Sequence, residues 1–360
     1  MRKIISSLLV AFLSVSTMIS ISACTIRYNN EYDINSDNIK NLIILIGDGM
    51  GPNHIHNAKT YFELDNQTFE NGYITTLNTD SLTAEEPTDS AAAGTALATG
   101  VSVRNSRIGH SDTEPLKNIM EYASEKNMLT GIITDDALFG ATPAAFSSHT
   151  LDRGNVMEIM DDQSKGPLDL LIGQYNQEYY SYASMFTSNG FAMVDNTNDL
   201  YTVEYPQKVI ANINNVHSIY NEDYANQVNM LDLVKYAIDY LDNDDGFVLM
   251  VECAYIDKFS HGNELISALS EVRTLFDIAN YIYDYIDDNP DTALIVTSDH
   301  ETGGLQRTNL KAEISDDLYT TGNHTKTFVN LYAKGITTTV TETIKNTFVH
   351  EMACEVISKQ

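Results

Sequence analysis

Four short runs of the chain are apolar on both faces, and they constrain its fold more than any other feature. A strand with one face in solvent alternates apolar and polar residues, whereas a strand buried in a parallel sheet is apolar throughout. The four runs are Asn41–Gly47, Leu129–Thr134, Phe247–Glu252 and Thr292–Ser298. Their pattern predicts strands inside a sheet that is covered on both sides.

Helical patterns lie between these runs. Apolar residues recur every three or four positions in Leu116–Lys126, Asn229–Leu241 and Leu265–Asp288, and Phe328–Ala333 is typical of a late strand. This alternation predicts an α/β fold in which helices are layered on a sheet. The stretch Gln174–Asn229 is rich in Asn and Tyr and shows no clear elements.

The net charge argues against one large class of partners. The chain of 360 residues has 21 basic and 50 acidic residues, and its formal charge of -29 argues against a surface for nucleic acid or an anionic membrane. An excess of carboxylates suits a protein that holds several divalent cations, and it also occurs on an ordinary soluble, self-repelling surface. The length is compatible with one large α/β domain.

The N-terminus has the pattern of a secretory signal. Arg2 and Lys3 precede the apolar segment Ile4–Ile19, and small residues then lead to Cys24. This pattern resembles a bacterial lipoprotein processing site. Residues 1–23 are therefore the predicted signal peptide, and Cys24 is the predicted lipidated N-terminus of a protein anchored outside the cytoplasmic membrane, through lipid alone. Ordinary cleavage and secretion is the alternative.

After the lipid attachment site, residues 24–40 are rich in Asn, Asp and Ser, and we predict a tether there. Residues 41–360 are then a single domain. Cys253 and Cys354 remain in the mature chain. They are compatible with one disulfide in an oxidising compartment, but Cys253 lies in an apolar run and is equally compatible with an inert buried thiol.

The alanine-rich stretch Thr88–Gly100 predicts a helix with a polar N-terminus. Thr88, Asp89 or Ser90 lies near the N-cap, and Gly100 follows the last helical residue. A serine at this end faces the positive end of the helix dipole, which favours an anion such as phosphate or the alkoxide of the serine itself. The alternative is that Ser90 only caps a buried helix of small residues.

Potential metal ligands follow the predicted strands. Asp48 comes after the run that begins at Asn41, Glu252 ends a later run, and Asp299 and His300 come at the end of another. Ligands of open α/β sheets collect beyond the carboxyl ends of the strands. These side chains are therefore expected to lie close together.

A second set of candidate ligands follows Glu252. Asp257 and His261 are four residues apart, so a helical turn presents both on one face, and His324 is available further along the chain. The pair Asp257 and His261, like the pair Asp299 and His300, is by itself more often a polar contact than a pair of metal ligands. The repeated occurrence of such pairs at strand ends favours metal binding. Mixed His and carboxylate sets suit zinc in a hydrolytic role, and sets of oxygen ligands suit magnesium.

Several separated motifs, in the same order along the chain, are similar to those of alkaline phosphatases. The segment Thr88–Ala92 resembles the nucleophile segment of that family, which makes Ser90 the residue that is phosphorylated. Arg153 resembles the arginine that holds the non-bridging phosphate oxygens. The resemblance implies a three-layer α/β sandwich with a large, mostly parallel central sheet that helices flank, and a single catalytic domain over residues 41–360.

The resemblance also implies two zinc ions and one magnesium ion. The implied ligands are Asp257, His261 and His324 for the first zinc, Asp48, Asp299 and His300 for the second, and Asp48, Thr142 and Glu252 for magnesium. In such a centre the serine displaces the alcohol of a phosphate monoester, and water then releases phosphate from the phosphoserine. A broad monoesterase that scavenges phosphate from small esters is the default expectation.

The chain departs from the family pattern at two places. Gly140 stands where many relatives carry an aspartate or histidine near magnesium, although Lys258, a neighbour found in bacterial relatives, is present. Outer-shell side chains tune metal affinity, so a higher magnesium requirement is expected. Few residues separate His300 from His324, so the crown insertion of the family is reduced or absent, dimerisation through a crown is not expected, and the oligomeric state stays open.

Two alternatives to a monoesterase stay open. Phosphodiesterases, sulfatases and metal-dependent mutases of the same superfamily have related ligand sets. A sulfatase needs a Cys/Ser-x-Pro-x-Arg segment, which Ser90–Ala93 lacks, and diesterases generally lack the arginine and the magnesium ligands. The other alternative is a surface lipoprotein that captures phosphate or metal without turnover, in which a serine nucleophile has no purpose.

Overall fold

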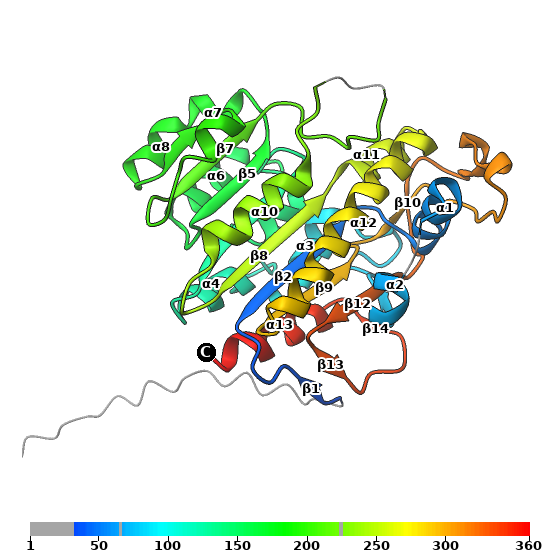
Figure 1. Ribbon diagram of the computed structural model, residues 1–360, viewed down its shortest axis with the longest axis horizontal. Coiled ribbons are helices and arrows are strands. Elements are labelled where there is room, and N and C mark those ends of the chain that lie inside the picture. Colours follow the sequence, from blue (N-terminus) through cyan, green and yellow to red (C-terminus); the bar gives the residue numbers. More distant parts are fainter. Residues whose placement is uncertain (1–31, 65–66, 223–225) are drawn as a thin grey trace, which may run out of the picture. The chain divides into compact units, whose positions relative to one another are not determined.

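In the computed structural model, the four apolar runs form neighbouring strands at the centre of one sheet (Figure 1). In space they lie in the order β9 (Thr292–Thr297), β2 (Asn41–Gly47), β8 (Phe247–Cys253) and β4 (Leu129–Thr134), and all are parallel. All their residues are buried. The prediction of buried parallel strands is confirmed.

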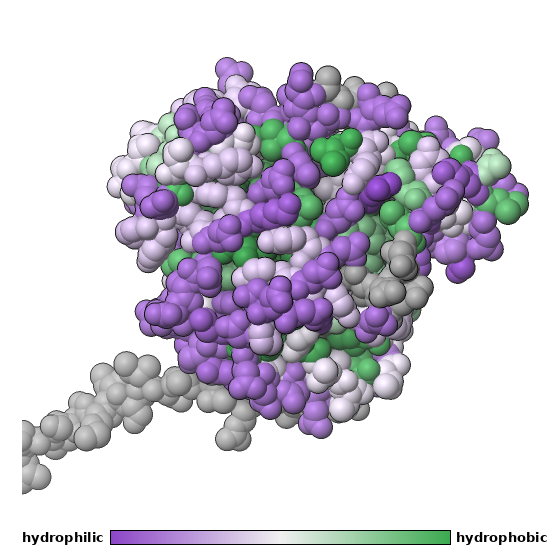
Figure 2. Space-filling view, viewed as in Figure 1, coloured by the Kyte–Doolittle hydropathy of each residue, from purple (hydrophilic) through white to green (hydrophobic). Residues whose placement is uncertain are grey.

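The structure describes residues 32–360 except residues 65–66 and 223–225. The predicted signal peptide, residues 1–23, and the predicted lipid attachment site, Cys24, lie outside the described residues. Within the described part of the chain, every helix is too short or too polar to cross a bilayer. Figure 2 shows hydrophilic side chains over much of the visible surface, as the net charge of -29 leads one to expect.

Further strands on both sides complete a sheet of ten described strands. Its order is β14-β3-β12-β9-β2-β8-β4-β5-β7-β6, and β12 alone in this sheet is antiparallel to its neighbours. The added strands are β3 (Tyr73–Asn78), β5 (Leu170–Gln174), β6 (Ala192–Val194), β7 (Val209–Ile213), β12 (Val329–Lys334) and β14 (Ile344–Lys345). The sheet is therefore mostly parallel, as predicted.

Helices cover both faces of the sheet, because alternate residues of β2 enter two different hydrophobic clusters. On one face, Ile43 and Leu45 share a cluster with residues of α1 (Pro52–Phe62), α10 (Met230–Leu241) and α12 (Leu265–Asp288). On the other face, Leu42, Ile44 and Ile46 share one with residues of α3 (Ser90–Thr99), α4 (Ile119–Ser124), α6 (Val156–Lys165) and α13 (Phe348–Ser358). Shorter helices contribute residues to both clusters. The three-layer α/β sandwich is confirmed.

One predicted helix is shorter than its apolar pattern. The pattern predicts Leu116–Lys126, but α4 begins at Ile119. Asn118 forms a capping box there: its side chain accepts a hydrogen bond from the amide of Glu121 at 3.1 Å, and the Glu121 carboxylate accepts one from the amide of Asn118 at 2.8 Å. This cap fixes the first turn and stops the helix from extending toward Leu116.

The remaining elements are short. They are the helices α2 (Gln67–Gly72), α5 (Ala141–Ala145), α7 (Glu178–Ser181), α8 (Ala183–Ser188), α9 (Thr197–Leu200) and α11 (Tyr255–His261), two 3₁₀ turns (Lys311–Glu313 and Asp316–Leu318), and the strands β1 (Ile34–Asn35), β10 (Glu301–Thr302), β11 (His324–Thr325) and β13 (Thr337–Thr338). The stretch Gln174–Asn229 contains α7, α8, α9, β6 and β7. These span three to six residues each, which is too short for a periodic pattern.

The described part of the predicted tether packs against the domain. β1 pairs with β13 near the C-terminus, and Ser36 and Ile39 are buried. The tether therefore stays a prediction only for the part of residues 24–40 that precedes Tyr32. Of the two remaining cysteines, Cys253 is buried and Cys354 is partly buried, and no disulfide joins them in the described part of the chain.

Candidate metal and phosphoryl-transfer site

The candidate ligands gather at the carboxyl edge of the central strands. Asp48 directly follows β2, Glu252 lies near the end of β8, and Asp299 and His300 follow β9 after one further residue. The parallel register places Ile46 beside Glu252, so the strand ends lie level with one another. The predicted gathering of these four side chains at one edge is confirmed.

Gly49 allows the loop after β2 to lie against α11. Its φ of +71° is in the left-handed region, and its amide donates a hydrogen bond to Asp299 Oδ1 at 3.1 Å. A Cβ atom at this position would lie 2.8 Å from Asp257 Oδ1. Glycine is thus required both for the backbone conformation and for the close approach of Asp257.

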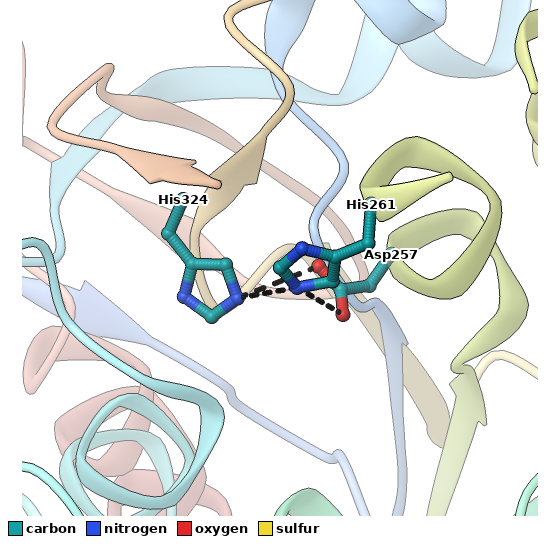
Figure 3. Close-up of side chains that lie close together, drawn as sticks. All are labelled: Asp257, His261 and His324. Atoms are coloured by element: carbon teal, nitrogen blue, oxygen red, sulfur yellow. Dashed lines mark hydrogen bonds and ion pairs between the residues drawn. The ribbon is translucent and has the colours of Figure 1, made fainter. Parts of the chain in front are cut away.

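Three side chains form the outer part of the site, which we call the rim group: Asp257 and His261 from α11, and His324 from β11 (Figure 3). His261 Nε2 lies 3.3 Å from Asp257 Oδ2, and His324 Nε2 lies 3.6 Å from Asp257 Oδ1. The two Nε2 atoms are 3.1 Å apart. All three side chains therefore point toward one place, as the i, i+4 spacing predicts.

Backbone carbonyl groups fix the orientation of the rim histidines. His261 Nδ1 donates to the carbonyl oxygen of Gly322 at 2.7 Å, and His324 Nδ1 donates to that of Thr88 at 2.8 Å. A ring that donates through Nδ1 keeps its Nε2 lone pair free. Metal-binding histidines commonly have such a partner on the other nitrogen.

The inner part of the site, which we call the floor group, consists of Asp48, Asp299 and His300. His300 Nε2 lies 3.5 Å from Asp48 Oδ1 and 3.3 Å from Asp299 Oδ2. Both of these carboxylate oxygens are buried without a hydrogen-bond donor among the described residues. Buried oxygens of this kind cost free energy unless a cation or a donor contacts them, so they fit a metal ion.

The pKa values of the floor group show the same need for a cation. Burial, with the Asp299 carboxyl nearby, raises the pKa of Asp48 well above its usual range. Burial also raises the pKa of Asp299 to about 6 and lowers that of His300 to about 4. Each shift favours the neutral form, because buried charges without a partner are unfavourable. A bound divalent cation would reverse this preference for the carboxylates.

Thr302 connects the rim group to the floor group. Its hydroxyl donates a hydrogen bond to Asp257 Oδ1 and lies 3.3 Å from His300 Nδ1. Because the hydroxyl proton is used for Asp257, the hydroxyl oxygen can accept a hydrogen bond from His300 Nδ1. This arrangement leaves His300 Nε2 as an acceptor that faces Ser90 and the two floor carboxylates. A threonine in a loop has no pattern that would reveal this role from the sequence.

Ser90 lies at the first position of α3, and its Oγ is 3.3 Å from His300 Nε2. The helix begins there because Asp89 is the N-cap: its Oδ1 accepts a hydrogen bond from the amide of Ala92 at 2.9 Å. Gly100 ends the helix with a φ of +73°. Every residue of α3 is buried, as expected of a helix of small residues, but Asp89 rather than Ser90 provides the cap. The Ser90 hydroxyl instead faces the candidate ligands.

Arg153 lies beside the helix N-terminus. Its Nη1 is 3.3 Å from Asp89 Oδ2, which also accepts a hydrogen bond from the amide of Ser106 at 2.9 Å. The Arg153 side chain is 40% exposed. The pair therefore leaves part of the guanidinium accessible next to Ser90, the position predicted for a phosphate-binding arginine.

Glu252 and Thr142 are buried near the end of β8 and in α5. Glu252 Oε2 accepts a hydrogen bond from the Thr134 hydroxyl at 2.5 Å, and burial raises the pKa of Glu252 to about 8. Thr142 Oγ1 is buried and has no hydrogen-bond partner among the described residues. A carboxylate and a hydroxyl oxygen of this kind suit magnesium. Thr134, like Thr302, is a supporting residue that has no recognisable signal in the sequence.

Two groups of described residues bring three potential ligand atoms within 4.8 Å of one another: Asp257 with His261 and His324, and Asp48 with Asp257 and His300. The first is the predicted set for the first zinc. The second contains Asp257 in addition to Asp48 and His300 of the floor group. Asp299 contacts this second group through His300. Asp257 therefore lies between the two sets, which the sequence does not indicate.

Comparison with known proteins agrees with this arrangement. The sequence profile "Alkaline phosphatase" matches residues 39–167 and 176–356. Alkaline phosphatase 3 of Bacillus subtilis (strain 168) is 31% identical over 293 residues, which are 75% of this chain and 63% of that protein. Alkaline phosphatase 4 of the same organism is 32% identical over 290 residues, 74% of this chain and 62% of that protein. The chain thus spans somewhat under two thirds of the length of these relatives.

Solved structures show the same similarity. Alkaline phosphatase from the Antarctic bacterium TAB5 superposes with a TM-score of 0.75 at 26% identity, covering 89% of this chain and 98% of that one. A variant of that enzyme with Mg bound in the M3 site superposes with a TM-score of 0.74 at 25% identity, with the same coverage of both chains. By the extent of the sequence match and by its fold, this chain belongs to the alkaline phosphatase family.

Proposed function

We propose that this protein hydrolyses phosphate monoesters through a phosphoserine at Ser90. One observation carries the proposal: the Ser90 hydroxyl lies at the N-terminus of a buried helix and 3.3 Å from His300 Nε2, within a set of candidate metal ligands. The helix N-terminus favours negative charge on the serine oxygen and on the incoming phosphate. A protein that only captured phosphate would have no use for a nucleophile in this position.

The reaction would take place in two displacements. Ser90 Oγ attacks phosphorus, the bond from phosphorus to the ester oxygen breaks, and the alcohol leaves with a proton. Water then attacks the phosphoserine, phosphate leaves, and the serine hydroxyl is restored. Bound divalent cations would stabilise the serine alkoxide and the charge that develops on the transferred phosphoryl group. Asp89 keeps Arg153 beside Ser90, and the guanidinium would donate hydrogen bonds to the non-bridging phosphate oxygens.

For the metals, we propose two zinc ions and one magnesium ion. The rim group would hold one zinc, the floor group the other, and Asp48, Thr142 and Glu252 the magnesium. The two three-ligand groups and the buried oxygens without donors support this assignment. The relative with Mg bound in the M3 site supports the third ion. Chelation should abolish activity, zinc should restore most of it, and metal analysis should give at least two transition-metal ions per active chain.

The natural substrates in this proposal are small phosphate monoesters, and the role is phosphate scavenging. We also propose that the protein acts outside the cytoplasmic membrane, anchored by lipid on Cys24. The motivation is the charged, apolar and small-residue pattern of residues 1–23. Cys24→Ala should leave an unprocessed or mislocalised precursor. A wild-type protein that is soluble in the medium with an unmodified N-terminus would show secretion instead.

The test of the proposed function is hydrolysis of p-nitrophenyl phosphate by the zinc- and magnesium-loaded protein. Ser90→Ala should lose nearly all activity and should not incorporate labelled phosphate. Arg153→Ala should lower kcat/KM for the monoester about ten- to a hundredfold, because a charge-assisted contact is worth roughly 1.5 to 3 kcal/mol. Hydrolysis of a diester should change little in Arg153→Ala, since a diester has one charge fewer. Equal loss for both esters would favour a diesterase.

A further inference from the structure

An ion pair outside the rim and floor groups lies beside the proposed magnesium ligands. Lys258 follows Asp257 on α11, and its Nζ lies 2.5 Å from Oδ1 of Asp136 in the loop after β4. The Lys258 ammonium group also lies 4.6 Å from the ring centre of Tyr255. Because the ammonium has two partners, its long side chain is held in one direction.

A short series of hydrogen bonds leads from this ion pair to Glu252. The amide of Asp136 donates to Thr134 Oγ1 at 3.0 Å, and the Thr134 hydroxyl donates to Glu252 Oε2 at 2.5 Å. Thr134 is fully buried and Glu252 nearly so. The position of the Asp136 amide therefore orients the Thr134 hydroxyl. The Thr134 hydroxyl in turn orients the Glu252 carboxylate.

Gly140 provides the space for this arrangement. Its amide donates to the carbonyl oxygen of Ala137 at 2.7 Å and closes a tight turn just after Asp136. A Cβ atom at residue 140 would lie 2.9 Å from that carbonyl oxygen and 3.5 Å from Asp136 Oδ2. A side chain at this position would therefore force the turn to move, and its Cβ atom would be in van der Waals contact with the carboxylate of Asp136.

We propose that Asp136, held by Lys258, positions Glu252 for the third cation and supplies near that site the carboxylate that Gly140 cannot. Asp136 is a positioning residue here, and it acts through Thr134 and through its charge. Side chains that orient a ligand in this way change metal affinity about ten- to a hundredfold. The inference rests on the proposed function, because it assumes a cation at Asp48, Thr142 and Glu252.

The experiment measures binding of Mn²⁺ to the zinc-loaded protein by electron paramagnetic resonance. Asp136→Asn and Lys258→Met should each weaken Mn²⁺ binding about ten- to a hundredfold. The double variant should bind about as weakly as the weaker single variant, because both changes break one interaction. Gly140→Ala should weaken binding in the same direction by moving the turn. Zinc content should stay at the wild-type value in all four variants.

Lys165 and Asp161 on α6 supply a matched control, since they form an exposed ion pair with a distance of 2.6 Å. Asp161→Asn and Lys165→Met should leave Mn²⁺ affinity unchanged. The inference is overturned if Asp136→Asn and Lys258→Met both keep wild-type affinity to within about twofold. It is also overturned if the wild-type protein binds no Mn²⁺ beyond zinc. The hydrolysis rate of the same wild-type sample separately decides the proposed function.

Discussion

The rim group and the floor group contain the same kinds of side chain, yet they behave differently because water reaches the rim group more easily. The His261 side chain is 41% exposed, whereas those of His300 and Asp299 are 0% exposed. Burial alone would raise the pKa of Asp257, but the hydrogen bonds with His261 and Thr302 and the charges of the nearby histidines together outweigh burial and lower it. The hydrogen bond with Asp257 raises the pKa of His261 to about 9. Without metal, Asp257 and His261 thus form an ion pair, whereas burial lowers the pKa of the third rim residue, His324.

In the floor group, burial dominates, and the pKa shifts of Asp48 and His300 both favour the neutral forms. One carboxylate oxygen of Asp48 and one of Asp299 have no donor among the described residues. The comparison teaches that the degree of burial decides whether a set of ligands is satisfied without metal or left with buried polar atoms that lack a partner. We therefore expect the floor ion to be held tightly and the rim ion to exchange more readily.

The strongest way to break this comparison is to remove the floor histidine. His300→Ala should lower kcat/KM by about a thousandfold or more, because a metal ion contributes several kcal/mol to the transition state. Added zinc should not restore activity, since the cavity leaves Asp48 and Asp299 facing each other. Activity assays across a zinc titration measure this effect. Recovery in millimolar zinc would contradict a tightly held floor ion.

A smaller effect is expected at the rim. His261→Ala should weaken zinc binding and lower activity about ten- to a hundredfold at limiting zinc. Excess zinc should restore much of the rate, because water can occupy the exposed coordination position. A chelator competition assay compares the affinity of the variant with that of wild type. If His261→Ala proves as inactive as His300→Ala at every zinc concentration, depth does not distinguish the two groups.

Much of this centre could be predicted from the sequence, because its residues follow strands whose apolar runs are easily recognised. Buried parallel strands leave a strong pattern, and their carboxyl ends meet at one edge, so the sequence alone is enough to group Asp48, Glu252, Asp299 and His300. The i, i+4 spacing of Asp257 and His261 likewise has a simple geometric meaning.

Other features depend on contacts between distant segments and have no local pattern. Asp257 lies between both ligand groups because Gly49 lets the loop after β2 approach α11, and this contact joins residues 208 positions apart. Thr302, Thr134 and the carbonyl of Thr88 act through one or two hydrogen bonds each. A hydroxyl or carbonyl group in a loop is too common for its partner to be predicted from sequence.

The link between the two groups provides the next prediction. Thr302→Val keeps the shape of the side chain but removes the hydroxyl that contacts Asp257 and His300. We expect activity to fall about five- to thirtyfold, which corresponds to roughly 1 to 2 kcal/mol and is of the order of one hydrogen bond. Thr302→Ser keeps the hydroxyl and should stay within about threefold of wild type. Equal losses in the two variants would point to packing rather than to the hydrogen bonds.

The smallest effect on activity is expected at a buried carboxylate outside both groups. Glu271 on α12 is almost fully buried, and its Oε1 accepts a hydrogen bond from the amide of Ser218 at 3.2 Å. Burial raises its pKa from 4.5 to about 8, and the nearby Asp135 carboxyl is also buried. Unlike the floor carboxylates, Glu271 belongs to neither group of candidate metal ligands, so ionisation in the folded state should be purely unfavourable.

The sign of the resulting pH dependence follows from this raised pKa. Below about pH 4.5, Glu271 is protonated in both the folded and the unfolded chain. Between about pH 4.5 and 8, Glu271 is ionised in the unfolded chain but still protonated in the folded one. The wild-type protein therefore loses stability as the pH rises through this range. Glu271→Gln cannot ionise and keeps an acceptor for Ser218. It should increase the free energy of unfolding by a few kcal/mol at pH 9 and by much less at pH 5. Chemical denaturation at fixed zinc and magnesium measures this difference, with exposed Glu204→Gln as the control. A gain that is equal at both pH values would show that charge at Glu271 is not its cause.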